Sequence, residues 1–206
     1  GYGELALNSL PGKIGDQDVR DLMLTTEHLI GTGQVDAGRL GVVGGSHGGF
    51  LSCQLTSKPG IAHRFKATVM RNPVTNLTTM LGTTDIEDWI IYECGLATEE
   101  ERIRSAGGVG TGAITMGLSD ADLHSMWSKS PMSNVKEVTA ATLMLLGKDD
   151  RRVPPSQGRE WVRALRVQGN VEVACYEYDD NDHPIAAAFA DADVWVNTVV
   201  WLSSYL

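Results

Sequence analysis

The sequence has few cysteines and no long apolar run. Its three cysteines, Cys53, Cys94 and Cys175, are an odd number at wide spacing. This pattern matches neither a disulfide framework nor a zinc site, so it favours a reducing, cytoplasmic setting. No apolar run approaches about 20 residues, so no membrane-spanning helix is expected. The first 15 residues lack the basic and apolar regions of a signal peptide.

Positive charge is also scarce. The chain carries 17 Lys and Arg against 26 Asp and Glu, a net charge of −9 with a pI of about 4.9. This balance argues against nucleic acid or an anionic membrane as the main partner. Hydrophobic residues make up 42% and charged residues 21%, as in ordinary globular proteins. We predict one domain over residues 1–206, a length that can bury a sizeable core.

One glycine-rich stretch stands out at residues 44–48. An apolar run ends there in GGSHG, which fits the G-x-S-x-G pattern of a nucleophile elbow, a turn between a strand and a helix with a serine at its tip. Glycines on both flanks, Gly44 and Gly48, would let strand and helix approach, and we expect Ser46 to adopt strained backbone geometry. Five-residue matches also occur by chance. The strand formers before this one and the helical spacing of apolar residues after it favour the elbow.

Strands and helices alternate over most of the chain. We expect strands at residues 40–43, 65–70, 142–146 and 171–178. We expect helices at residues 16–30, 46–57, 156–167 and 187–206. The alternation predicts an α/β protein with a mostly parallel, doubly wound sheet. In such sheets, functional sites collect at the carboxyl ends of the strands.

Residues 74–130 break this rhythm, and residues 1–15 resemble a loop. We interpret 74–130 as an insertion that supplies pocket walls. It contains expected short helices and a glycine-rich loop. The helices are predicted at 85–93, 99–104 and 120–127, and the loop at 107–117.

A nucleophilic serine needs a histidine base and an orienting carboxylate, in the chain order Ser, Asp, His on this type of fold. Of five histidines, His183 alone follows a plausible strand-end acid, although a loop histidine among aspartates is often only a solvated residue. The acid is Asp149 or Asp150, and spacing does not choose between them. The backbone N–H of His47, which follows the nucleophile, would donate to the oxyanion.

Other signals are weaker. The glycines at 107–112 lack the Lys-Ser/Thr of a phosphate loop, so nucleotide binding receives little weight. The acidic loop at 179–182 could attract a cation, but a solvated loop explains it better. We therefore predict no cofactor and no metal.

Several segments together resemble the catalytic portion of the acylaminoacyl-peptidases, a branch of the prolyl oligopeptidase family of serine peptidases. The segments are SLPG at 9–12, GDQDV at 15–19, GGSHGG at 44–49, RNPV at 71–74, MLGTTDIEDW at 80–89 and LMLLGKDDRRVP at 143–154. The resemblance covers most of the chain and weakens across 95–125 and around residue 183.

The resemblance implies an α/β-hydrolase fold and a serine exopeptidase that releases an N-acyl amino acid from N-acylated peptides. It places the triad aspartate at Asp150, with Ser46 as nucleophile and His183 as base, and implies that Arg152 holds a substrate carbonyl. We also expect four apolar residues to line the substrate pocket. They are Val74, Ile86, Trp89 and Ile90.

Members of this family also carry an amino-terminal β-propeller, the first sheet strands and a loop that donates the second oxyanion hydrogen bond. Because the sequence starts at GYG, which resembles the end of a family segment, we expect a carboxyl-terminal fragment that lacks these parts. The alternatives are a dipeptidyl peptidase or oligopeptidase, an esterase of the same fold, or a truncated fragment without activity. We further expect a homo-oligomer.

Overall fold

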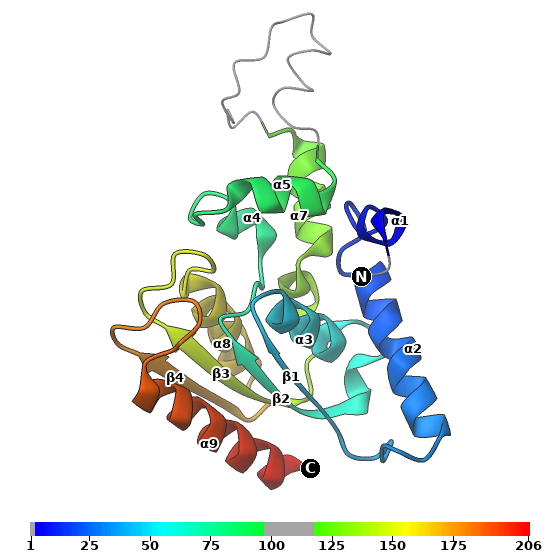
Figure 1. Ribbon diagram of the computed structural model, residues 1–206, viewed down its shortest axis with the longest axis vertical. Helices are drawn as coiled ribbons and strands as arrows, with labels where there is room; N and C mark the ends of the chain where they lie inside the picture. Colours follow the sequence, from blue (N-terminus) through cyan, green and yellow to red (C-terminus); the bar gives the residue numbers. More distant parts are fainter. Residues whose placement is uncertain (1–2, 97–117) are drawn as a thin grey trace, which may run out of the picture.

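The structure is a computed structural model that describes residues 3–96 and 118–206. The helix expected at 99–104 and the glycine-rich loop expected at 107–117 lie outside the described residues. The described residues contain a central sheet with helices on both of its faces, and a group of short helices at one end of the sheet (Figure 1).

The sheet has four parallel strands in the spatial order β1-β2-β3-β4. They are β1 (Leu40–Gly45), β2 (Phe65–Arg71), β3 (Ala141–Gly147) and β4 (Val173–Tyr178). The predicted parallel sheet is thus confirmed. Within the described residues β3 is central and buried along its whole length, which accounts for its uninterrupted apolar sequence. The strand β4 lies at an edge and is only partly buried.

Helices cover both faces of the sheet, as a doubly wound fold requires. The helices α3 (His47–Ser57) and α8 (Ser156–Gln168) lie on one face, and α2 (Gln17–Gly31) packs on α3. The helix α9 (Ala188–Tyr205) covers the opposite face (Figure 1). Each of these helices was expected within a residue or two. The short helix α1 (Glu4–Leu7) was not, since residues 1–15 were interpreted as a loop.

The segment between β2 and β3 forms a lobe beyond the carboxyl ends of the strands (Figure 1). Its described elements are α4 (Leu77–Met80), α5 (Glu87–Cys94), α7 (Asp120–Lys129) and the 3-10 helix η2 (Pro131–Glu137); another 3-10 helix, η1 (Ala62–Arg64), precedes β2. A buried apolar cluster joins this lobe to Phe50 of α3. The lobe is therefore packed directly above the helix that begins at residue 47.

Candidate active site

Ser46 occupies the junction between β1 and α3 in a rarely populated backbone conformation. Its φ is 58° and its ψ −122°, a conformation that costs about 1–3 kcal/mol for a residue with a side chain. Two hydrogen bonds hold it there. The Ser46 N–H donates to the Arg71 carbonyl over 3.0 Å, and the Ser46 carbonyl accepts from the Phe50 N–H over 2.9 Å. The expected elbow geometry is present.

The glycines around Ser46 do not contribute equally to this turn. A Cβ on Gly44 would collide with the Gly48 carbonyl, and a Cβ on Gly49 would lie 2.7 Å from the Pro73 Cβ. A Cβ at Gly48 would meet nothing within 4 Å. Our expectation that Gly44 and Gly48 together provide clearance is therefore wrong for Gly48. Gly49, one residue later, is the glycine that lets α3 approach the end of β2.

A buried carboxylate holds the histidine of the acidic loop. The His183 Nδ1 lies 2.7 Å from the Asp150 Oδ2, and the Asp150 side chain is fully buried. The other carboxylate oxygen, Oδ1, accepts from the backbone N–H groups of Arg152 and Val153, each over 2.9 Å. Asp149 is exposed, and only its backbone N–H is directed toward this loop. Of the two candidate acids, the structure brings Asp150 to His183.

Ser46 itself is not hydrogen-bonded to this pair. Within the described ranges, the Ser46 hydroxyl has no hydrogen-bond partner, and the His183 ring is bonded only to Asp150. Catalytic hydrogen bonds are often long without substrate, so the Ser46–His183 contact stays a prediction.

A hollow of about 380 Å³ opens beside His183. Its lining residues are Asp85, Asp149, Asp150, Arg151, Arg152, Asp182, His183 and Pro184.

Asn72 links three parts of the site, and our sequence reasoning missed this role. Its Nδ2 donates to the His183 carbonyl over 2.8 Å, and its Oδ1 accepts from the Gly147 N–H over 2.9 Å. It is buried, with a φ of 42°, a region that asparagine tolerates better than most residues. Asn72 thereby joins the ends of β2 and β3 to the histidine loop. The sequence offered one indication of this role: Asn72 stands between the end of a predicted strand and Pro73, at the sheet edge where functional residues collect.

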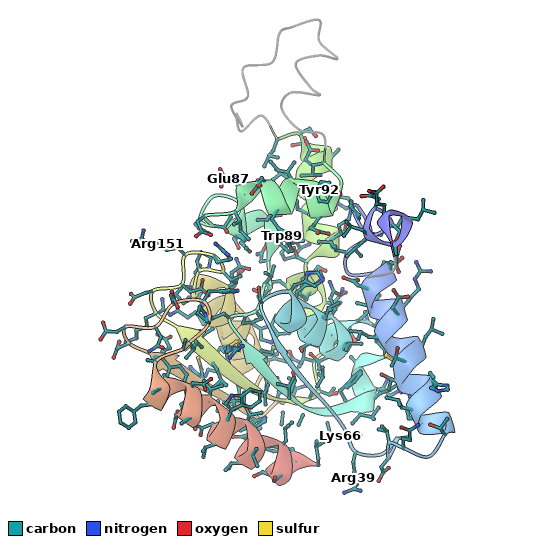
Figure 2. All side chains as sticks on the ribbon, in the orientation of Figure 1. Arg39, Lys66, Glu87, Trp89, Tyr92 and Arg151 are labelled. Carbon is teal, nitrogen blue, oxygen red and sulfur yellow. The ribbon has the colours of Figure 1, made fainter. Side chains whose placement is uncertain are left out.

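The predicted substrate-contact residues fall into different environments. Arg152 is half exposed and pairs with Asp85, its Nε lying 3.3 Å from the carboxylate. Val74 and Ile90 are fully buried in the lobe's core and do not face the surface, so they would not contact a substrate directly. Ile86 and Trp89 are half-buried. Figure 2 shows Trp89 on α5, above the start of α3.

His47 combines two features at the first position of α3. Its backbone N–H belongs to the first turn, where the helix offers no internal acceptor. Its ring stacks on Phe50 with centroids 5.2 Å apart and meets the Trp89 ring edge-on at 5.9 Å. The ring Nε2 lies 3.3 Å from the Oδ2 of Asp18, on α2. The side chain that follows Ser46 is thus in contact with residues of α2, α3 and α5.

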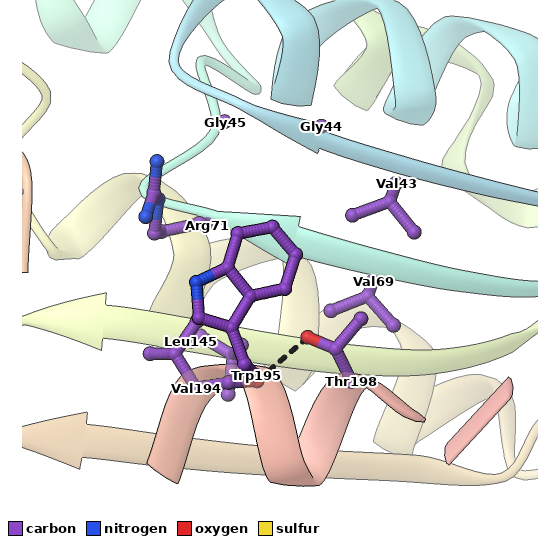
Figure 3. A pocket seen from close by; sticks show the side chains of 9 residues that line it. All are labelled: Val43, Gly44, Gly45, Val69, Arg71, Leu145, Val194, Trp195 and Thr198. Atoms are coloured by element: carbon purple, nitrogen blue, oxygen red, sulfur yellow. Dashed lines mark hydrogen bonds between the residues drawn. The ribbon is translucent and has the colours of Figure 1, made fainter. Parts of the chain in front are cut away.

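A separate apolar hollow of about 140 Å³ lies between the exposed side of β1 and α9 (Figure 3). Trp195 and Thr198 of α9 and Arg71 at the end of β2 line it. It contains neither Ser46 nor His183, so it is distinct from the hollow beside the histidine.

In the part of the chain that the structure describes, no cluster of three or more His, Cys, Asp or Glu residues could hold a metal ion. No helix among those residues is long and apolar enough to cross a membrane.

A parallel sheet with a strained serine at a strand–helix elbow, and a carboxylate–histidine pair on the loops after β3 and β4, defines the α/β-hydrolase class. Within that class, the chain belongs to the prolyl oligopeptidase family, whose model matches residues 1–106 and 109–206.

Curated relatives are more specific. The chain is 40% identical to an acylamino-acid-releasing enzyme of Arabidopsis thaliana over 206 residues, and 35% identical to that of Homo sapiens over 207 residues. Both alignments cover 100% of this chain but only 25% and 26% of the relatives. The chain thus spans about a quarter of the length of the curated relatives that it matches.

Solved structures share the fold. A puromycin-hydrolyzing peptidase of Mycobacterium tuberculosis superposes with a TM-score of 0.82 at 20% identity, covering 100% of this chain and 28% of that one. An acylaminoacyl peptidase of Pyrococcus horikoshii gives a TM-score of 0.70 at 22% identity, covering 89% of this chain and 26% of that one. At such identities these likenesses support the α/β-hydrolase fold alone.

Proposed function

We propose that this chain is the catalytic part of a serine peptidase that hydrolyses N-acylated peptides and releases the N-acyl amino acid. The observations that support the proposal are the buried Asp150–His183 pair, on the loops after β3 and β4, and the strained elbow serine at the end of β1. The identity of 35–40% to acylamino-acid-releasing enzymes supports the choice of substrate.

In this proposal, the Ser46 hydroxyl attacks the carbonyl carbon of the N-acylated first residue. The unbound ring nitrogen of His183, Nε2, accepts the hydroxyl proton and later donates it to the leaving peptide amine. Asp150 holds Nδ1, which fixes the tautomer and stabilises the imidazolium that forms. Water then releases the N-acyl amino acid from Ser46 by the same steps in reverse.

The developing oxyanion needs hydrogen-bond donors that are already in place. The backbone N–H of His47 is suited to this task because it lies at the start of α3, where helix geometry leaves it without an internal acceptor. One such donor lowers the barrier by roughly 2.7–4 kcal/mol. Arg152, on the rim of the hollow beside His183, would donate to a substrate carbonyl once it separates from Asp85.

The apolar wall of the substrate site would consist of Ile86 and Trp89, supported by the buried Val74 and Ile90.

The proposal also includes where the protein acts and how it assembles: we propose a cytoplasmic homo-oligomer. The scarcity of cysteine supports the location, and exposed apolar residues along α9 support assembly.

The test uses the full-length protein that contains this chain and acetyl-alanine p-nitroanilide as substrate. We expect Ser46→Ala to lower kcat by roughly 10⁶-fold and Asp150→Asn by roughly 10⁴-fold. Asp149→Asn, the same change at the exposed neighbour, should leave kcat within about twofold. Equal effects of the two aspartate changes, or turnover without Ser46, would refute the assignment. Faster hydrolysis of a free dipeptidyl anilide or a simple ester would redirect it to those alternatives.

A further inference from the structure

Three elements place an ionisable side chain beside the nucleophile, on residues that the proposed reaction does not use as acid or base. We name Asp18 of α2, His47 of α3, and Trp89 and Glu93 of α5 the elbow cluster. Asp18 contacts the His47 ring at 3.3 Å, and Trp89 meets the same ring at 5.9 Å. Glu93 lies one helical turn after Trp89, on the same face of α5.

The cluster contains buried polar atoms without partners. Within residues 3–96 and 118–206, the Nδ1 of His47 and the Oε2 of Glu93 are buried and make no hydrogen bond, and the buried Oδ2 of Asp18 has only its 3.3 Å ion-pair contact with the His47 Nε2. The Asp18 side chain is only 10% exposed. Buried polar atoms are normally hydrogen-bonded, so two such atoms beside a carboxylate oxygen with a single ion-pair contact favour a polar group of a bound molecule at this place.

The atoms of the cluster indicate which chemical group would bind there. The Asp18 Oδ2 and the Glu93 Oε2 are carboxylate oxygens, which accept hydrogen bonds when ionised. Burial raises the pKa of the Glu93 carboxyl; His47 nearby lowers it and the like-charged Asp18 raises it, so the three groups share one electrostatic environment. The Trp89 ring adds a face that attracts cations. A hydrogen-bond donor, best a cation, would satisfy this arrangement.

The cluster also adjoins Ser46 along the chain. His47 directly follows Ser46, so their Cα atoms are about 3.8 Å apart. The His47 side chain is 34% exposed, which leaves the cluster accessible over that ring. A group that contacts this ring would therefore adjoin the residue that carries the proposed nucleophile.

We propose that the elbow cluster binds the side chain of the substrate's first residue and selects for side chains that donate hydrogen bonds, ammonium above hydroxyl. This inference rests on the proposed function, because it assigns a specificity to the same site. Asp18 and Glu93 would accept from the donor, and the rings of His47 and Trp89 would pack on its aliphatic stem.

The experiment compares matched p-nitroanilides with the full-length protein. The pairs are acetyl-lysyl against acetyl-norleucyl and acetyl-threonyl against acetyl-valyl. We expect the wild type to prefer the donor in each pair, and Asp18→Asn and Glu93→Gln to reduce the lysyl preference in kcat/KM about tenfold. Asp21→Asn, an exposed carboxylate on the same helix, is the matched control and should change neither preference.

Preferences that stay within twofold of wild type in both variants, or a wild-type preference for the apolar members, would overturn the inference. A loss confined to the threonyl pair would overturn the ranking of ammonium above hydroxyl.

A second measurement needs no turnover. In the Ser46→Ala protein, calorimetry should show tighter binding of acetyl-lysine than of acetyl-norleucine, and Glu93→Gln should remove the difference. Equal binding of the two compounds overturns the inference even if the wild type hydrolyses none of the four anilides. That absence of hydrolysis would itself refute the proposed function.

Discussion

Asn72 shows how a single residue outside the expected triad can determine its geometry. The backbone carbonyl of His183 is held by the Asn72 amide, and the Gly147 N–H is held by its oxygen. Gly147 precedes the loop that carries Asp150. The Asn72 side chain therefore restrains both the loop after β3, which carries Asp150, and the loop after β4, which carries His183.

We expect Asn72→Asp to lower kcat about tenfold in the full-length protein while KM changes little. Aspartate keeps the oxygen that accepts from Gly147 and tolerates the positive φ, but it loses the donor to His183, and small displacements of a catalytic group are costly. Asn72→Gly, which relieves the backbone but removes both hydrogen bonds, should lower kcat at least as much. Wild-type kcat in both variants would show that Asn72 does not position His183. Steady-state kinetics provides the measurement.

At the scale of elements, the elbow depends on how closely α3 approaches the end of β2. That approach is set by Gly49 packing on Pro73, with Gly44 clearing the helix backbone at Gly48. The G-x-S-x-G pattern marks the turn correctly. Its last glycine, however, has open space around the position of a Cβ.

Gly49→Ala should therefore lower the free energy of unfolding by about 1–3 kcal/mol, because a methyl group 2.7 Å from Pro73 forces α3 away from β2. Gly48→Ala is the control for the same change one residue earlier, and we expect an effect within about 0.5 kcal/mol. Urea unfolding of each variant measures both values. A similar loss for the two variants would mean that helix–strand contact is not the cause.

At the scale of the whole molecule, α9 is unusual because it is apolar on its outer face as well as its inner one. Ala190, Val194 and Thr198 are buried. Val196, Val199 and Val200 are each about 60% exposed, and Phe189 is 94% exposed. A helix that is apolar all round is normally covered, which favours association through this face.

If the proposed homo-oligomer assembles through α9, Val199→Lys should lower the average mass of the protein at high concentration, because a charge in a buried apolar contact is costly. Val167→Lys on α8, where an isolated valine is 88% exposed, is the matched control and should have no effect. Static light scattering over a range of concentrations gives the average mass. An unchanged mass for Val199→Lys, or an equal reduction in the control, would contradict assembly through α9.

Local patterns predicted most of the fold. Short apolar runs indicated the strands, as at β3, which ends in Gly147, and helical spacing indicated α3 and α8. The short helices α1 and α4 were missed because four-residue helices have too little periodicity to be recognised. Tertiary contacts, which no local pattern encodes, stabilise such short elements.

The sequence by itself determined the elbow serine, the histidine of the acidic loop and the parallel sheet, because each depends on residues close together along the chain. Spacing along the chain left Asp149 and Asp150 open, and the family resemblance favoured Asp150. The tertiary structure brought Asp150 to His183, placed Asn72 between two loops, and grouped Asp18, His47 and Glu93 near the start of α3. These groupings join residues more than 25 positions apart. Their distances are set by how strands and helices pack, which local sequence patterns do not specify.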